Sequence, residues 1–194
     1  MTNNSMIHKI TNKFKHVKHK FKRPYVPTTT PDEVKAANEL KSLVATDLAD
    51  YIYVDANYDV NSGLGVGAYV SLAATGPAQQ NVHVATGYSS QLEISLLTLI
   101  DALNSVPLEV RQAKNVAVVL TNVDVVKAFN DFSMLAKRVE TLDERVSTDR
   151  LQAQLVELTI TFRSLRMSVA MPHEAAFTQL LQTKITRIKK AHKE

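Results

Sequence analysis

Residues 51–57 read YIYVDAN, in which β-branched and aromatic side chains lead up to an aspartate. Such side chains are favoured in strands, so we expect a strand over 51–54 that ends at Asp55. Residues 57–67 then contain Asn, Asp, Ser and three glycines, a composition that predicts a turn. The stretch therefore indicates a first strand whose last side chain is a carboxylate beside a glycine-rich connection.

Two further short strands follow this stretch. One is expected at 67–72 and the next begins at 82–85, with Gly76 and Pro77 marking the turn between them. Because so few residues separate the three strands, they should form an antiparallel meander.

The rest of the chain alternates between helical and strand patterns. Leucines between 92 and 103 recur every three or four residues, which predicts a helix capped by Ser89 or Ser90. The continuous apolar run at 116–120 is typical of a strand buried on both faces, as in a parallel pair. The other expected elements are a leading helix at 31–44, helices at 123–132, 151–162 and 174–190, and a fifth strand at 165–171.

This order predicts an α/β fold with a mixed five-stranded sheet. Three antiparallel strands come first, two further strands follow after crossover helices, and helices flank the sheet. With 45% hydrophobic residues, a chain of 194 residues can bury one ordinary core. We place the domain at 32–194, with its core at 48–185, and assign 1–31 to a basic tail and linker.

The tail differs in charge from the domain. Residues 1–31 contain seven basic and no acidic residues, whereas residues 32–194 contain 16 basic and 19 acidic residues, a net charge of −3. Apolar side chains between Ile7 and Phe21 recur every three or four residues, which predicts an amphipathic helix that ends at Pro24. The basic residues are Lys9, Lys13, Lys15, Lys18, Lys20, Lys22 and Arg23.

Three interpretations of this tail stay open. Its seven basic residues could bind nucleic-acid phosphates. Its apolar stripe could instead lie on an anionic membrane surface, with the lysines facing the lipid headgroups. It could also dock on the domain or on a partner and leave the lysines in solvent. Net charge alone does not separate the three.

Composition excludes several classes of site. The chain has no cysteine, so disulfides and thiolate metal sites are excluded, and a reducing, cytoplasmic location fits.

No apolar run approaches the roughly 18–20 residues that span a bilayer. The N-terminus also lacks the continuous apolar segment of a secretory signal.

Three stretches, taken in order, resemble the ribonuclease H family across the core. Residues 51–57 and GLGVGAY at 63–69 resemble its first strand, ending in an aspartate, and its glycine-rich hairpin. SQLEISLLTLIDAL at 90–103 is similar to its helix that opens with a glutamate. VLTNVDVV at 119–126 is similar to its fourth strand, whose end normally carries Thr-Asp-Ser.

The resemblance implies a metal site built from carboxylates. Two divalent ions about 3.5–4 Å apart activate water and stabilise the leaving oxygen of a phosphodiester, and Mg²⁺ or Mn²⁺ prefers oxygen ligands. On this basis Asp55 and Glu93 occupy the first two carboxylate positions and would bind the metal. Asn122 occupies the third, where an amide brings no charge. Glu174 lies near the expected fourth position, and Asp124 is another possible substitute.

With two carboxylates in place of four, metal affinity should fall sharply. We therefore expect a ribonuclease-H-like, nucleic-acid-binding protein with weakened or lost metal-dependent nuclease activity, whose partner is RNA or an RNA–DNA hybrid. One alternative is an active nuclease that cleaves RNA in RNA–DNA hybrids with Asn122, Asp124 or Glu174 assisting. A second is an interaction protein that docks through its tail on a membrane or partner.

Each candidate residue also has a structural interpretation. Asp55 could simply form a turn after its strand. Glu93 would be favourable near a helix N-terminus through the helix dipole alone. Asn122 could cap the helix that follows it.

Overall fold

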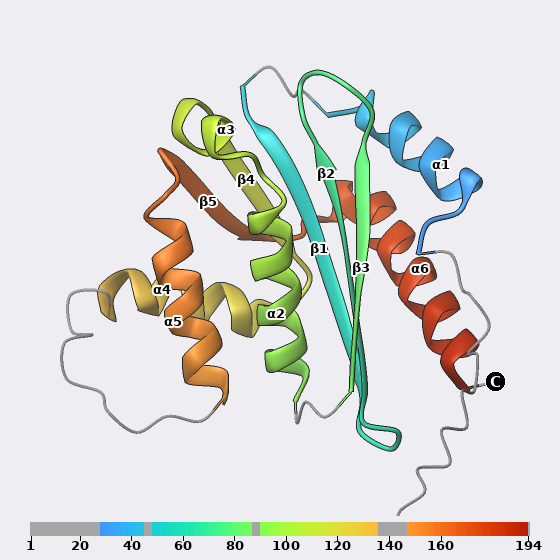
Figure 1. The fold of residues 1–194 in the computed structure, drawn as a ribbon. Coiled ribbons are helices and arrows are strands. Elements are labelled where there is room, and N and C mark those ends of the chain that lie inside the picture. The colour runs from blue at the N-terminus through green and yellow to red at the C-terminus, as the bar shows by residue number, and fades with distance from the viewer. Residues whose placement is uncertain (1–27, 45–47, 87–89, 136–146, 194) are drawn as a thin grey trace, which may run out of the picture.

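The computed structural model describes residues 28–44, 48–86, 90–135 and 147–193. They form a five-stranded sheet with helices on both faces (Figure 1). The strands are β1 (Asp50–Asp59), β2 (Leu64–Leu72), β3 (Gln79–Thr86), β4 (Asn115–Leu120) and β5 (Ser164–Val169). Their order in the sheet is β3-β2-β1-β4-β5, with β1, β2 and β3 antiparallel and β4 parallel to both β1 and β5. The predicted mixed sheet is therefore confirmed.

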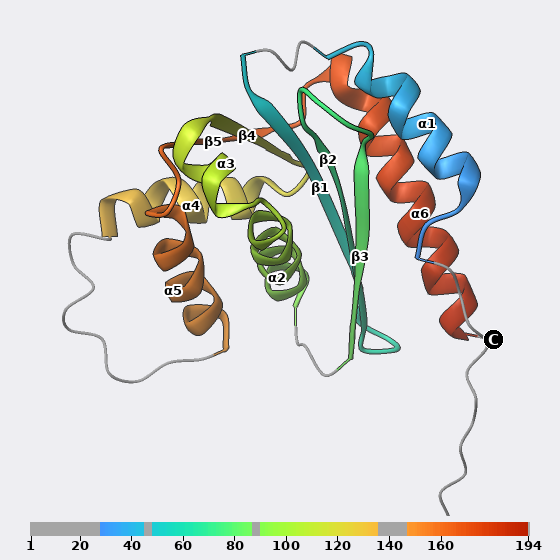
Figure 2. The ribbon, with the colours of Figure 1, turned by 45° about the horizontal axis from the view of Figure 1, so that its top comes forward.

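Helices cover the sheet in two layers. Figures 1 and 2 show α1 and α6 on one side, with α2, α4 and α5 on the other. The helices are α1 (Pro31–Lys41), α2 (Gln91–Asn104), α3 (Leu108–Ala113), α4 (Val123–Leu135), α5 (Ser147–Thr159) and α6 (Ala175–Lys193), with a short 3₁₀ turn, η3 (Pro172–Glu174), before α6. Ser90 caps α2 as predicted, because its hydroxyl accepts the N–H of Glu93. The short α3 was not predicted.

The first hairpin differs from the expected one. The turn occupies only residues 60–63, and β1 and β2 pair through the rest of the predicted turn, with Asn57 opposite Val66. Backbone pairing therefore overrides local turn propensity here. Gly67 serves close packing instead of a turn, because a Cβ there would lie 1.7 Å from Thr98 Oγ1 on α2. The actual turn uses Gly63, whose φ is +64°.

Alternation along β1 divides its side chains between two cores. Ile52 and Val54 pack into the core beneath α2, while Tyr53 packs on the opposite side with residues of α6. The Tyr53 ring stacks on Phe177, with ring centroids 4.1 Å apart. Since side chains two residues apart point to the same face of a strand, Asp55 points toward α6.

An ion cluster attaches α1 to α6 and β3; we call it the Glu33 cluster and define it as Thr29, Glu33, Gln80, Lys184 and Arg187. Fully buried Lys184 places Nζ 2.8 Å from Thr29 Oγ1, 2.8 Å from Gln80 Oε1 and 3.5 Å from Glu33 Oε2. Arg187 donates to both Glu33 oxygens, at 3.0 and 3.1 Å. Burial raises the pKa of Glu33. Hydrogen bonds from Arg187 and Thr30 and the charge of Lys184 lower it by more than burial raises it, so the pKa lies below its usual value.

The tail predictions fall outside the residues that the structure describes. These are the amphipathic helix, its seven basic residues and its three open interpretations, so all of them stay predictions, as does the domain boundary at residue 32. None of the described helices is long and apolar enough to cross a membrane.

Candidate functional site

Asp55 lies in the middle of β1, directly after Val54, the last β1 residue that pairs with β4. The strand was predicted to end at Asp55, but its pairing with β2 continues to Asp59. Asp55 Oδ1 accepts hydrogen bonds from the Ala56 N–H at 2.8 Å and from the Thr121 hydroxyl, which follows β4. The side chain of Gln182, on α6, donates a further hydrogen bond to the carboxylate. The residue is only 8% exposed, so its carboxylate is held mainly by protein donors.

The electrostatic environment of Asp55 does not favour its charge. Burial raises the pKa of the Asp55 carboxyl group above its usual value. The hydrogen bonds from Thr121, Ala56 and Gln182 oppose that rise without cancelling it. Among its described hydrogen-bond partners every donor is neutral, so the buried carboxylate has donors but no cation paired with it.

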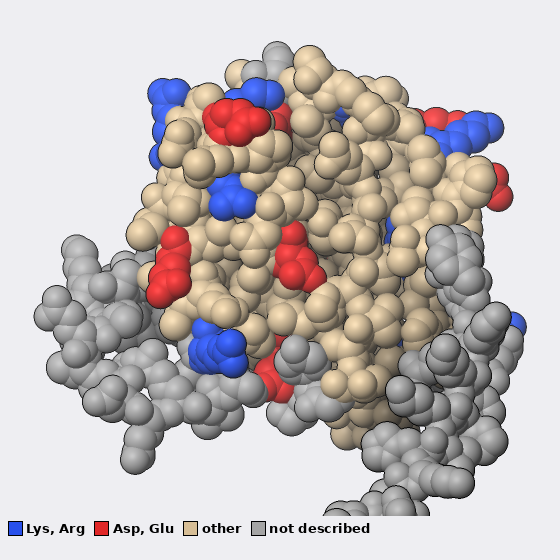
Figure 3. Space-filling model, in the orientation of Figure 1, with Lys and Arg blue, Asp and Glu red and all other residues tan. Residues whose placement is uncertain are grey.

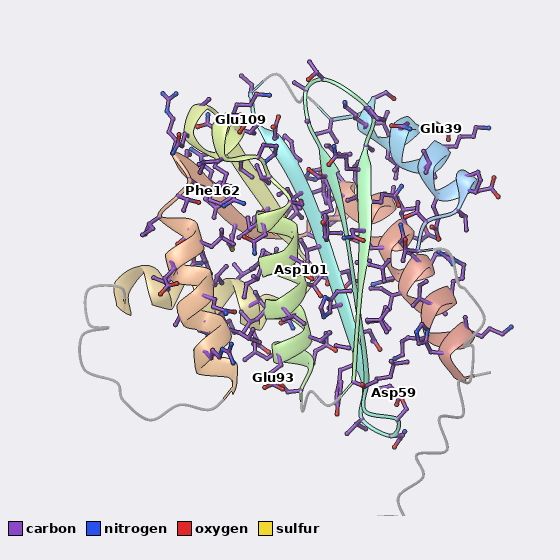
Figure 4. All side chains as sticks on the ribbon, viewed as in Figure 1. Glu39, Asp59, Glu93, Asp101, Glu109 and Phe162 are labelled. Carbon is purple, nitrogen blue, oxygen red and sulfur yellow. The ribbon has the colours of Figure 1, made fainter. Side chains whose placement is uncertain are left out.

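Glu93 sits in the first turn of α2, at the lower end of that helix in Figure 4. Glu93 is 1% exposed, and its backbone N–H donates to Ser90 Oγ at 3.1 Å. The helix covers the face of β1 opposite the one that Asp55 uses. Nearby, Gln91 joins α2 to β1 by donating to the Ala56 carbonyl and accepting the Tyr58 N–H. A metal site shared by Asp55 and Glu93 stays a prediction.

Asn122 occupies the place where the resemblance implies a third carboxylate. Its Oδ1 accepts the N–H groups of Asp124 at 2.9 Å and Val125 at 3.4 Å, and its Nδ2 donates to Ser95 Oγ at 3.2 Å. The side-chain oxygen is therefore used as a helix cap for α4. To ligate a metal, this oxygen would have to turn away from both N–H groups.

The side chains of the two proposed substitutes, Asp124 and Glu174, make no described contact with Asp55 or Asn122. Asp124 is exposed in the first turn of α4. Glu174 ends η3 on the α6 side of the sheet, where its Oε2 accepts the Met171 N–H at 2.8 Å and its Oε1 accepts the Tyr53 hydroxyl at 3.3 Å. Its described contacts therefore position the start of α6, and none of them is with Asp55.

An open pocket of about 630 Å³ lies over Asp55, between the end of β1 and α6. We call it the β1–α6 pocket; it is lined by Asp55, Ala56, Asn57, Gln182, Ile185, Thr186, Lys189 and Lys190. Neither Glu93 nor Asn122 is among its lining residues. Thr121, Gln182 and the two lysines were not predicted from the sequence as part of a site.

These residues do not fit the divalent metal centre that the resemblance implies. Within the described ranges, no group of three or more His, Asp or Glu residues is placed to hold a metal ion. The Asp55 Oδ1 and Asn122 Oδ1 atoms each already accept two hydrogen bonds from protein donors. Two dications require more anionic oxygen than this arrangement offers.

Charge is not concentrated on the face that shows α2 and β3. Figure 3 shows acidic and basic side chains scattered over this face, with no large patch of either sign on the described residues. Figure 4 labels two of the acidic ones, Asp101 and Glu109. No continuous basic surface is visible on the described part of this face.

Comparison with known proteins gives a likeness in fold. No protein-family model and no curated protein matches the chain in sequence. Among solved structures, ribonuclease H1 from the halophilic archaeon Halobacterium salinarum is 15% identical, with a TM-score of 0.51 over 71% of this chain and 95% of its own. The N-terminal ribonuclease H domain of a Mycobacterium tuberculosis protein, solved as a fusion with maltose-binding protein, is also 15% identical, with a TM-score of 0.53 over 75% and 99%.

At this level of identity the likeness concerns the fold and does not extend to activity. It agrees with the strand order β3-β2-β1-β4-β5, with its antiparallel meander and its two parallel crossover strands. On these grounds the chain has the ribonuclease H fold.

Proposed function

We propose that the chain is a nucleic-acid-binding protein that keeps the ribonuclease H fold and has lost most or all metal-dependent nuclease activity. The observation that carries the proposal is the Asp55 carboxylate. The resemblance to ribonuclease H implies a metal ligand at this residue, yet Thr121, Ala56 and Gln182 donate hydrogen bonds to it. A carboxylate bound in this way serves the fold and has little capacity left for Mg²⁺ or Mn²⁺.

Three features support nucleic acid as the partner. Both solved neighbours are named as ribonuclease H proteins, whose substrates contain RNA. Seven basic residues without an acidic one precede the domain, and clustered lysines bind phosphates. Arg187 Nη2 donates to the Thr28 carbonyl at 3.4 Å, so the chain enters the described region beside α6. The tail and the α6 lysines could then act on one nucleic acid.

The competing function is an active Mg²⁺- or Mn²⁺-dependent ribonuclease acting on RNA–DNA hybrids. It would use Asp55 and Glu93 as ligands and Asn122, Asp124 or Glu174 as substitutes. Asn122 would have to give up the hydrogen bonds that its Oδ1 accepts from the Asp124 and Val125 N–H groups. A cleavage assay separates the two functions because only the competing one predicts a product.

The test uses the full chain and an end-labelled RNA–DNA hybrid. At micromolar protein with Mg²⁺ or Mn²⁺, we expect the hybrid to stay intact, as it does with Asp55→Asn. In EDTA, fluorescence anisotropy should detect hybrid binding that weakens steeply with salt. Replacing the seven basic residues of the tail by Gln should weaken this binding further. Metal-dependent cleavage that Asp55→Asn abolishes would establish the competing function, and absence of any hybrid binding would refute the proposal.

A further inference from the structure

Helix α6 presents three different sides. Phe177, Leu181, Ile185 and Ile188 pack toward the sheet, and Lys184 and Arg187 reach Glu33 in α1. Gln182, Thr186 and Lys189, spaced by three or four residues, line the β1–α6 pocket together with Lys190. The third side carries no apolar stripe and belongs neither to the core nor to the Glu33 cluster.

The lysines of this pocket keep unused hydrogen-bonding capacity. Lys189 Nζ donates to Asn57 Oδ1 at 2.5 Å, which fixes the ammonium group over the end of β1. An ammonium group has three donors, so two remain for a ligand. The Asn57 amide nitrogen and the Thr186 hydroxyl, both on exposed residues, add uncharged donors around the same space.

The charge balance of the pocket favours an anion. Two cationic side chains line it, Lys189 and Lys190, against one carboxylate, Asp55. That carboxylate is 8% exposed and accepts hydrogen bonds from its own neighbours. Two ammonium groups at the pocket would repel a cation, whereas a phosphate would meet hydrogen-bond donors there.

We infer that the β1–α6 pocket binds a backbone phosphate of the nucleic acid, with Lys189, Lys190 and Asn57 as its contacts. The inference rests on the proposed function and adds to it a second phosphate contact, separate from the tail. The resemblance implied a metal cation beside Asp55 on β1. We infer instead that the pocket at this part of the strand binds an anion.

The experiment measures hybrid binding by the full chain as a function of salt. Replacing a phosphate-binding lysine lowers the slope of log affinity against log salt by about one. Lys189→Gln/Lys190→Gln should therefore lower the slope by roughly two and weaken binding at every salt concentration. The control, Lys35→Gln/Lys127→Gln, removes the same charge from exposed positions on α1 and α4 and should leave the slope near that of the wild type.

A second pair of variants tests the pocket without touching a lysine. Asn57→Asp adds a carboxylate beside Lys189 and should reduce affinity at least as much as Lys189→Gln. Asn115→Asp adds the same charge at the start of β4, the opposite end of the sheet, and should change affinity little. Unfolding curves for all four variants establish that the fold is intact.

The outcomes separate this inference from the proposed function. No binding of the hybrid by the wild type refutes the proposed function. Binding by the wild type, with pocket and control variants indistinguishable from it, refutes the pocket alone. Inorganic phosphate at constant ionic strength is the second probe: if it shifts the Asn57 and Thr186 amide resonances saturably while the lysine variants bind hybrid normally, the site takes a free anion and the inference is wrong.

Discussion

Two carboxylates contact α6, and each belongs to a residue that is 8% exposed. Glu33 is paired with cations, because Arg187 donates to both of its oxygens and Lys184 lies 3.5 Å away. Asp55 receives hydrogen bonds from Thr121, Ala56 and Gln182, which are all neutral. Their pKa values move in opposite directions: burial raises both, but only at Glu33 do the hydrogen bonds and cations outweigh it.

The difference shows which charge the fold depends on. At Glu33 a negative charge is needed, since without it Lys184 and Arg187 would be left near each other without an anion. At Asp55 the charge is tolerated and costs stability, because burial is not repaid by a cation. A buried charge that the fold does not require supports the proposal that protein hydrogen bonds, and not a metal ion, hold the Asp55 carboxylate.

The largest expected effect comes from removing the Glu33 charge. Glu33→Gln leaves Lys184 buried without its anion, and breaking a buried pair costs about 3–5 kcal/mol. Urea unfolding at pH 7 measures the loss. The control, Glu39→Gln, removes an exposed carboxylate from the same helix and should change stability by less than about 0.5 kcal/mol. Similar losses for both variants would mean that the Glu33 carboxylate contributes no more to stability than an exposed carboxylate on the same helix.

A smaller loss is expected where a donor to Asp55 is removed. Thr121→Val deletes the hydroxyl hydrogen bond and keeps the side-chain shape, and a hydrogen bond to a charged group contributes about 1.5–3 kcal/mol. In an Asp55→Asn background the same change should cost only about 1 kcal/mol, because the acceptor is then neutral. Equal costs in the two backgrounds would show that Thr121 does not act on the carboxylate charge.

Asp55→Asn itself should have the smallest effect on stability. The amide oxygen can still accept from Ala56 and Thr121, and the buried charge disappears, so the free energy of unfolding at pH 7 should stay within about 1 kcal/mol of the wild type or rise. Thermal and urea unfolding measure it. A loss as large as that of Glu33→Gln would mean that the comparison between the two carboxylates is wrong.

The two carboxylates should also give opposite dependences on pH. The Glu33 contribution is complete above the ordinary value of 4.5 and is lost as the pH falls through its lowered pKa. The Asp55 charge acts in the other sense: above 3.8, stability declines as the pH rises through its raised pKa. Unfolding of the wild type and of each neutral variant from pH 3 to 7 tests both signs.

The order of the strands and helices, apart from the short α3, could be predicted from local patterns, whereas the end of β1 could not. The valine-rich run at 116–120 indicates a doubly buried parallel strand, and this is what β4 is. The length of β1 depends on pairing of Asn57 with Val66 and on the Gln91 side chain binding the Tyr58 N–H. The first contact depends on the register of the hairpin and the second on a residue 33 positions away, and neither can be recognised from the composition of residues 57–67.

The site shows the same limit. The sequence marks Asp55, but the helix that supplies Gln182 lies far along the chain, and no periodic pattern links them. Lys184 does leave a signal that went unused: it falls within the apolar stripe of Phe177, Leu181 and Ile188, where a lysine must have a buried partner. A charged residue on a buried stripe can therefore be recognised, although its partner cannot.

The most direct test of the central claim is a Mn²⁺ titration of the full chain at pH 7. The electron paramagnetic resonance signal of the free ion measures how much Mn²⁺ is bound. If protein donors have taken over the Asp55 carboxylate, the wild type and Asp55→Asn should give superimposable titrations, with no saturable site at millimolar Mn²⁺. One or two saturable sites in the wild type that vanish in Asp55→Asn would contradict the claim and make this chain a metal-binding protein.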